Sequence, residues 1–190
     1  KRAEGIFRVR GARLVAVADI EKEKALRLAR PYGAEAFASI HDLLTTKNVD
    51  IVVIAVPNKF LKPIIIEVLE SGKNVLCEKP FGRNSAESLE ILDRIKSYCL
   101  VRVVFNHRYH PAVLEAKKLF DAGAIGKILF IRARYGHGGR KGMEKEWRFS
   151  RDLAGGGELL DQGVHIIDLC RWFHPYFSEV YGVIETKFWN

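Results

Sequence analysis

The sequence predicts an α/β fold that begins with a doubly wound parallel sheet and continues into a second, α+β domain. Three observations support this prediction. In the first part of the chain, short β-branched runs alternate with segments of helical period. Polar residues stand where these runs end. After residue 110 the alternation stops and glycine-rich polar segments appear, so we place one domain at 1–110 and the first part of another at 111–190.

The first domain is expected to contain strands joined by helices. The strand segments are apolar and end at a polar residue or a proline, and the helical segments carry their apolar residues on one side. The expected strands are 13–18, 48–58, 74–80 and 100–106, and the expected helical segments are 20–32, 41–44, 61–70 and 86–98. This alternation at short spacing is the pattern of a Rossmann-like sheet, which binds ligands at the carboxyl ends of its strands.

The second domain has a different pattern. We expect a helix at 112–122, a strand at 127–135 that starts a second sheet, a polar loop at 136–147 and a helix after 155–157. The final segment, 180–190, alternates as a strand does, but no later segment is left to pair with it. Because the chain also begins with a helix-like stretch where a first strand is expected, we predict truncation at both ends.

Composition limits the possible classes of protein. The chain has 190 residues, of which 48% are hydrophobic and 28% charged, as in soluble globular proteins. Its longest apolar runs have strand length, so no membrane span is expected. The net charge is +8, but the basic residues are scattered among acidic ones without an aromatic and basic pattern. We therefore expect no nucleic-acid partner, and a positive field that suits a phosphate-bearing ligand.

The cysteines and the first residues predict the compartment. Cys77, Cys99 and Cys170 are an odd number of widely spaced cysteines among apolar neighbours, as in reduced core thiols. The first ten residues lack the apolar core of a signal peptide. We therefore expect a cytoplasmic protein.

One helix near the end of the chain presents three acid-base groups. Asp161, His165 and Asp168 are separated by four and three residues, which places them on one face of an α-helix. An imidazole titrates near neutral pH and can move a hydroxyl proton, and a carboxylate one turn away can orient the ring. The alternative is a partly buried histidine with acidic neighbours. Metal binding is not expected, because one helix face leaves most of the coordination shell unsupplied.

Five motifs occur in order along the chain: AVPN at 55–58, SGKNVLCEKP at 71–80, NHRYHP at 106–111, GAIGKI at 123–128 and AGGGELLDQGVHIIDLCRWF at 154–173. With them the sequence resembles, over nearly its whole length, the family of glucose-fructose oxidoreductase, inositol dehydrogenase and the rhizopine-catabolism oxidoreductase (Gfo/Idh/MocA). The resemblance implies a dinucleotide-binding Rossmann-like domain, then a domain with a large, mostly antiparallel sheet. It also implies a homodimer or homotetramer.

The resemblance assigns a catalytic set. EKP is the family's catalytic lysine motif, so Lys79 is expected to contact a substrate hydroxyl, with a cis peptide before Pro80. His165 and Asp161 would complete the set and also bind substrate, while Asp168 would act behind them. Without the resemblance, Lys79 reads as an ordinary surface lysine.

Two departures from the family stand out. The G-x-G-x-x-G turn that holds a dinucleotide pyrophosphate is not found in residues 1–190, and we expect its place to be upstream of Lys1. Leu61 stands where relatives often carry a histidine.

Cofactor contacts are expected at the strand ends. The Asp19 carboxylate can accept hydrogen bonds from an adenosine ribose diol, which favours NAD, or it can cap the following helix. Arg13 and Lys22 leave NADP open. The other expected cofactor-binding residues are Pro57, Asn58, Glu78, Lys79 and Arg108.

Five residues are assigned to the substrate or its surroundings. Arg108 and Tyr109 contact nicotinamide or substrate, or Arg108 forms a salt bridge between the domains. Trp147 stacks on a sugar ring, with Arg140 and Lys141 holding a phosphate, or their loop is simply solvated.

These residues predict an NAD(P)-dependent oxidoreductase that transfers a hydride between a nicotinamide cofactor and a secondary hydroxyl of a sugar, sugar nucleotide or polyol. One alternative is an NAD-recycling glycosidase or lyase of the same fold. The other is a non-catalytic nucleotide or sugar sensor, which has no need to keep Lys79, Asp161 and His165 together.

Overall fold

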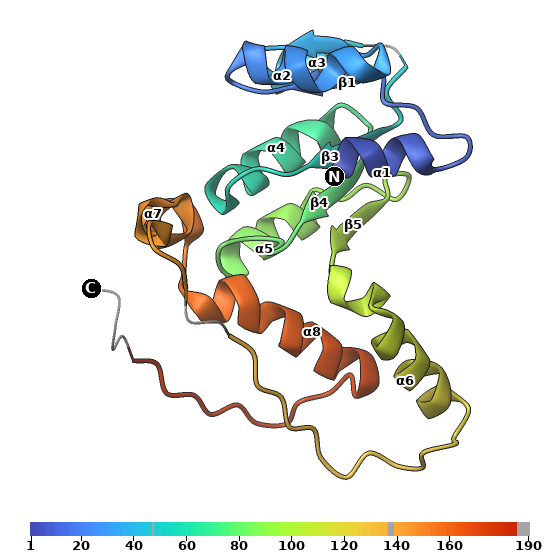
Figure 1. The fold of residues 1–190 in the computed structure, drawn as a ribbon, viewed down its shortest axis with the longest axis vertical. Helices are drawn as coiled ribbons and strands as arrows, with labels where there is room; N and C mark the ends of the chain where they lie inside the picture. Colours follow the sequence, from blue (N-terminus) through green and yellow to red (C-terminus); the bar gives the residue numbers. More distant parts are fainter. Residues whose placement is uncertain (47, 137–138, 186–190) are drawn as a thin grey trace. The chain divides into compact units, whose positions relative to one another are not determined.

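The computed structural model describes residues 1–46, 48–136 and 139–185. By its contacts the chain forms two compact units. The first comprises 1–54, 63–77 and 90–102, and the second comprises 55–62, 78–89 and 103–190. Figure 1 shows the order of the elements along the chain, and we describe each unit by itself.

The first unit begins with helix α1 (Arg2–Arg8) and a small parallel sheet. Strand β1 (Ala16–Ala18) pairs with β2 (Glu35–Phe37), with Val17 opposite Ala36. Between them the chain forms α2 (Lys22–Ala29) and a 3₁₀ turn, η1 (Arg30–Tyr32). Gly33 has a φ of 63° and ends this turn in the left-handed conformation that glycine favours.

A second parallel sheet has the order β3 (Ile51–Ile54), β4 (Asn74–Glu78) and β5 (Val101–Val104). The connections are α4 (Asn58–Glu70) and α5 (Ser85–Asp93), and the short α3 (Ile40–Leu44) precedes β3. Val52 stands opposite Val75 and Ile54 opposite Cys77, and these four side chains are buried. On each strand these buried side chains lie two residues apart, so they share one face of the sheet, and the residue between them is half-buried.

The core of the first unit is built from the apolar face of α4 and the strands beneath it. Ile65, Val68 and Leu69 have no exposed surface. Leu61, which belongs to the second unit, is equally buried. Burial raises the pKa of the Cys77 thiol to about 11, so this cysteine behaves as a core residue. All three cysteines are free thiols.

The strand orders of the two sheets match the two halves of the sheet in a dinucleotide-binding fold. In the common order of such folds, the third and second strands lie on one side of the first strand, and the fourth, fifth and sixth on the other. The pair of β2 with β1 and the set of β3, β4 and β5 follow this order. The Rossmann-like parallel fold class predicted for the first domain is therefore confirmed.

The second unit is mostly helical in its described part. It contains α6 (Pro111–Asp121), α7 (Arg151–Ala154) and α8 (Val164–Phe173), with 3₁₀ turns η2 (Asn106–Tyr109), η3 (Met143–Lys145) and η4 (Trp147–Phe149). A π-helical turn, η5 (Leu159–Gly163), leads directly into α8. No helix of the described ranges is long and apolar enough to cross a membrane.

The predicted second sheet is not confirmed. Residues 127–135 form no strand, and the described part of 180–190, up to Glu185, forms none either; residues 186–190 lie outside the description. Leu129 and Phe130 are 90% and 81% exposed. An alternating pattern gives a segment the capacity to pair, but a strand exists only where a partner completes its ladder.

Smaller differences concern the ends of elements. The strand β2 was missed because its three residues, EAF, form no apolar run. Helix α5 ends at Asp93 rather than near Tyr98. The predicted helix at 20–32 is divided into α2 and η1 because Pro31 stands at the start of a 3₁₀ turn.

Candidate active site

A lysine that directly follows β4 forms the centre of a polar cluster. A cis peptide bond joins Lys79 to Pro80, as expected. The Nζ atom of Lys79 lies 2.7 Å from Oδ1 of Asp161 and also donates to the main-chain oxygen of Asp161. The two side chains are 14% and 17% exposed. Residues 82 positions apart in the sequence are thus joined in a largely buried ion pair.

The carboxylate of Asp161 is held on both oxygens. Its Oδ2 atom lies 3.3 Å from Nε of Arg148 and 3.3 Å from Nε2 of Gln162, while Oδ1 faces Lys79. Asp161 lies in the π-helical turn η5. Such turns occur often at functional sites, because they turn side chains away from the regular α-helical stripe.

His165 occupies the first turn of α8 and is 5% exposed. Its ring stacks on that of His107, with centroids 4.0 Å apart and an angle of 22° between the planes. Phe105 packs edge-on at 6.1 Å. In the described part of the chain, Nδ1 of His165 is the buried side-chain nitrogen or oxygen atom that has no hydrogen-bond partner. Native structures rarely leave such atoms unpaired, so an orphan of this kind points to chemistry rather than packing.

The surroundings of His165 favour a neutral imidazole. Burial, the neighbouring His107 and the Lys79 ammonium lower the pKa of His165 to about 4, against a smaller opposite effect of Asp161 and Asp168. At neutral pH the ring is therefore uncharged and able to accept a proton.

Arg108 and Asp168 form a two-pronged salt bridge. Nε and Nη2 of Arg108 lie 2.7 and 2.6 Å from the carboxylate oxygens of Asp168. The hydrogen bonds to Asp168 raise the pKa of Arg108 further. The guanidinium also lies 5.3 Å from the ring centroid of Trp172. Of the two expectations for Arg108, the structure shows a salt bridge, and its partner is Asp168.

A second polar group, which we call the α7 anchor, ties α7 to the segments that follow β3 and β4. It consists of Asn58, Lys59, Arg83, Glu87 and Asp152. Buried Asn58 donates to the main-chain oxygen of Ala154 at 2.9 Å. Lys59 lies 2.6 Å from Asp152.

Arg83 is the most connected member of the α7 anchor. Its Nη1 donates to the main-chain oxygen of Asp152 at 2.8 Å. Its Nε and Nη2 atoms lie 3.0 and 2.6 Å from Oε1 of Glu87. The main-chain N–H of Arg83 donates to Oε2 of Glu87 at 2.8 Å. The buried Glu87 carboxylate is therefore fully engaged.

Asp19 belongs to the first unit and follows β1. Its Oδ1 atom accepts from the N–H of Glu21 at 2.8 Å, which is the turn contact expected of the alternative interpretation. A carboxylate has two oxygens, so this contact leaves Oδ2 available for a ribose diol.

The other predicted residues lie outside the ion pair of Lys79 and Asp161. Tyr109 is 73% exposed. The ring of half-buried Trp147 carries the guanidinium of Arg148 at 4.6 Å. Pro57 precedes α4 and its oxygen accepts from the N–H of Phe60, Arg140 pairs with Glu146, and Glu78 ends β4.

One expectation about α8 needs correction. The residues from Asp161 to Asp168 are not one regular α-helix, because η5 inserts a wider turn before Val164. The side chains of Ile166, Leu169, Cys170 and Phe173 line a small hollow with Ile131 and Ala133.

Three members of the cluster were not predicted from the sequence: His107, Arg148 and Gln162. Each is adjacent to a predicted residue, since His107 precedes Arg108, Arg148 follows Trp147 and Gln162 follows Asp161. The stacking partner of His107 is 58 residues further along the chain, so no local spacing indicates that contact.

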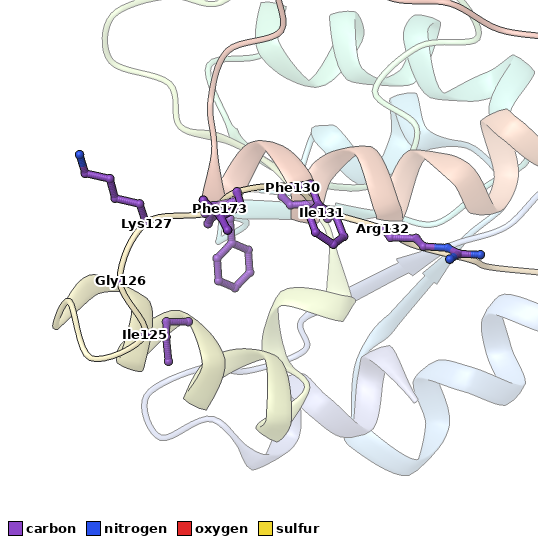
Figure 2. Close-up of a pocket in the computed structure, with 9 residues that line it drawn as sticks. Ile125, Gly126, Lys127, Phe130, Ile131, Arg132 and Phe173 are labelled. Carbon is purple, nitrogen blue, oxygen red and sulfur yellow. The ribbon is translucent and has the colours of Figure 1, made fainter.

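A second hollow, larger than the one beside α8, also lies in the second unit. An open apolar groove of about 470 Å³ is lined by residues 125–132 and Phe173. Figure 2 shows Phe130 and Ile131 along it and Lys127 and Arg132 pointing outward at its two ends. None of the cluster residues lines this groove, so its apolar walls do not mark the chemistry. The described residues contain no group of three or more side chains suited to a metal ion.

The parallel sheets define the class of the fold as Rossmann-like. Comparison with known proteins gives the family. Residues 2–107 match the model of an oxidoreductase family with an NAD-binding Rossmann fold, and residues 113–190 match the GFO/IDH/MocA C-terminal domain. The chain therefore belongs to the Gfo/Idh/MocA oxidoreductase family, and the matched Rossmann domain is of the NAD-binding kind, as expected.

Individual relatives agree with this assignment. The chain is 36% identical over 174 residues to levoglucosan dehydrogenase of Pseudarthrobacter phenanthrenivorans, covering 90% of this chain and 45% of the relative. It is 34% identical to inositol 2-dehydrogenase of Rubrobacter xylanophilus, covering 92% and 49%. A solved levoglucosan dehydrogenase in complex with NADH and levoglucosan superposes with a TM-score of 0.74 at 32% identity, covering 84% and 44%. The chain spans about half the length of these relatives.

Proposed function

We propose that this chain belongs to an NAD-dependent dehydrogenase that oxidises a secondary hydroxyl of a sugar or polyol to a ketone. The observation that carries the proposal is the contact of Lys79 with Asp161 beside a buried His165 whose Nδ1 has no partner. The relatives support the substrate class, since they are named as dehydrogenases of levoglucosan and inositol.

The Lys79 ammonium is suited to hold the substrate hydroxyl. An ammonium has three N–H donors, and two of them point to the side-chain and main-chain oxygens of Asp161. The third donor is left for a substrate oxygen. Together with Arg148 on the far side of Asp161, Lys79 also provides positive charge that stabilises an alkoxide as it develops.

His165 is suited to take the proton from that hydroxyl. The reaction removes a hydride from the carbinol carbon and a proton from its oxygen, and it leaves a C=O double bond. A bound nicotinamide supplies the hydride acceptor. The imidazole accepts the proton because its surroundings hold it neutral at physiological pH. Asp161 keeps Lys79 in place through Oδ1, while its Oδ2 atom is held by Gln162.

Asp19 fits the adenosine end of the cofactor. Its unused oxygen would accept hydrogen bonds from the ribose diol, and its negative charge would repel the phosphate of NADP. Pro57, Glu78, Asn58 and Arg108 are proposed as further cofactor contacts, although the side chains of the last two already serve the α7 anchor and Asp168. Tyr109 and Trp147 are proposed to contact the sugar.

The remaining assignments are proposals of the same kind. A division into domains at 1–110 and 111–190 is supported by the two family matches, which end and begin near it. A homodimer or homotetramer in the cytoplasm is proposed from the family resemblance and the three free cysteines.

The reaction is tested first with sugars and polyols. The full-length protein is incubated with NAD and with levoglucosan, myo-inositol and a panel of related polyols, and NADH absorbance is followed. Stoichiometric NADH supports the proposal. Product without net NADH would instead establish the cofactor-recycling glycosidase or lyase, and binding without product would establish a sensor.

The catalytic residues are tested by substitution. Lys79→Met and His165→Gln are expected to lower kcat by about 10² to 10⁴, the usual contribution of acid-base catalysis, with little change in NADH affinity. Lys118→Met and His110→Gln, in exposed positions, are the matched controls. Wild-type turnover in both Lys79→Met and His165→Gln would overturn the mechanism.

The role of Asp19 is tested by titration. Quenching of tryptophan fluorescence measures the Kd of NADH and of NADPH in the wild type and in Asp19→Ser. We expect the wild type to prefer NADH and the variant to lose that preference. A wild type that prefers NADPH would retain the enzyme and remove the role of Asp19.

A further inference from the structure

His107 stacks on His165 but has no role in the proposed reaction. Its ring covers one face of the His165 imidazole at 4.0 Å and nearly parallel. On its other side, Nε2 of His107 lies 3.5 Å from the hydroxyl of Tyr135, and the two rings meet edge to face at 5.3 Å. His107 is thus placed between a tyrosine and the buried imidazole.

The stacked geometry decides what His107 can do. The ring nitrogens of an imidazole donate and accept hydrogen bonds in the plane of the ring. Two rings stacked within 22° of parallel do not present their nitrogens to each other, so the contact offers no route for direct proton transfer. What remains is packing, which fixes the tilt of the His165 ring, and the interaction of charges across a short gap.

The charges around His165 come from four segments. Lys79 follows β4, Asp161 lies in η5, Asp168 lies one turn further along α8, and His107 lies in η2. Lys79 and Asp161 form an ion pair, and Asp168 is paired with Arg108, so each carboxylate has a cation of its own. Across the stack, His107 lowers the pKa of His165, and only burial has a larger effect.

We propose that His107 is a positioning residue for the reaction, which holds the His165 imidazole by its face and sets the lower pH limit at which His165 accepts a proton. A positive charge at this separation raises the free energy of the His165 imidazolium, so the contact with His107 lowers the pKa of His165. This inference rests on the proposed function, since it gives His107 a role in that reaction.

Two substitutions separate the two parts of the role. His107→Phe keeps an aromatic face and removes the charge, whereas His107→Lys keeps a charge and removes the face. His110→Phe, in the same turn but exposed, is the matched control. Retained circular dichroism and melting temperature identify the variants that fold.

The first measurement is independent of activity. The pKa of His165 is followed by NMR titration of its ring Cε1–H signal, assigned with His165→Gln. In His107→Phe we expect a rise of about one pH unit, because a charge at this distance is lost. In His107→Lys and His110→Phe the value stays low. An unchanged pKa in His107→Phe would overturn the proposal.

The second measurement uses turnover. The acid limb of kcat/KM reports the base of the free enzyme, so it is expected to move upward in His107→Phe with kcat near that of the wild type. In His107→Lys the limb stays in place, and kcat falls between about threefold and a hundredfold as the ring loses its support. Equal kcat in His107→Lys and the wild type would overturn the positioning role.

The two failures are distinguishable. If His107→Phe shifts the NMR titration but no substrate is oxidised by the wild type, the coupling of the two imidazoles stands and the proposed reaction falls. If the wild type is an active dehydrogenase and neither the titration nor the acid limb moves, the reaction stands and the inference about His107 falls.

Discussion

The α7 anchor and the cluster of Lys79, Asp161, His165 and His107 are built from the same kinds of residue, yet their polar atoms are treated differently. In the anchor, Asn58, Arg83 and Glu87 find partners at 2.6 to 3.0 Å. In the cluster, His165 is as deeply buried as Asn58, but its Nδ1 has no partner.

This difference separates a structural site from a reactive one. Pairing lowers the free energy of the folded chain, so a fully paired group contributes mainly to stability. A buried group left unpaired costs stability and is kept where chemistry requires it. We therefore expect anchor substitutions to change the free energy of unfolding and cluster substitutions to change turnover.

The largest expected effect is on turnover. His165→Gln is expected to lower kcat by about 10² to 10⁴ and to change stability little, because the imidazole gives up no hydrogen bond at Nδ1. Arg83→Met is expected to lower the free energy of unfolding by about 2 to 4 kcal/mol, since it leaves the buried Glu87 carboxylate with a weaker set of partners. Urea unfolding and steady-state kinetics measure both quantities.

The comparison fails if the two variants behave alike. Equal losses of stability with equal losses of kcat would mean that both sites serve the fold. The kinetic assay is run well below the melting temperature of Arg83→Met, so that unfolding does not reduce its apparent activity.

A second prediction concerns pH. The pKa of His165 is about 4 in the folded protein and 6.5 when exposed, so between these values the unfolded chain binds a proton that the folded chain does not. The contribution of His165 to the free energy of unfolding is therefore fully present above about pH 6.5. It decreases as the pH falls to about 4 and changes no further below that.

Urea unfolding between pH 7.5 and pH 4, compared for the wild type and His165→Gln, measures this contribution. The variant lacks the titrating group, so its curve is expected to fall less steeply over that interval. Parallel curves would show that the ring titrates normally and would remove the electrostatic argument for a neutral base.

The fold was largely predictable where the local sequence of a segment determines its secondary structure. The runs at 51–54 and 75–77 are continuous and apolar, which is typical of strands in a parallel sheet. The second sheet was not predicted correctly. Residues 127–135 have the alternating pattern of a strand, but strand pairing depends on a distant partner. The short β2 was missed because three residues carry no periodicity.

The site divides in the same way. Lys79, Asp161 and His165 were predicted from motifs, and the structure brings them together. His107 was missed because stacking on His165 depends on a tertiary contact and leaves no spacing in the sequence. The π-helical turn at 159–163 was also invisible, because its residues have the pattern of an ordinary helix.

A third prediction tests how closely the anchor packs. Gly155 ends α7 with a φ of 80°, and a Cβ atom added there would overlap the side chain of Arg83. Gly155→Ala is therefore expected to lower the free energy of unfolding by about 1 to 3 kcal/mol through backbone strain and the displacement of Arg83. Gly157→Ala is the control, since nothing lies within 4 Å of its added Cβ. Equal stability of the two variants would show that α7 is not held against Arg83.

The smallest effect is expected at the rim of the anchor, where Lys59 and Asp152 are paired at 2.6 Å with 41% and 67% of their side chains exposed. Water screens such a pair, so Lys59→Ala is expected to cost only about 0.2 to 1 kcal/mol, and less in high salt. Urea unfolding at low and high salt measures this. A loss as large as that of Arg83→Met would mean that α7 is held by its exposed ion pair, and the distinction between paired, buried groups and exposed ones would no longer explain the anchor.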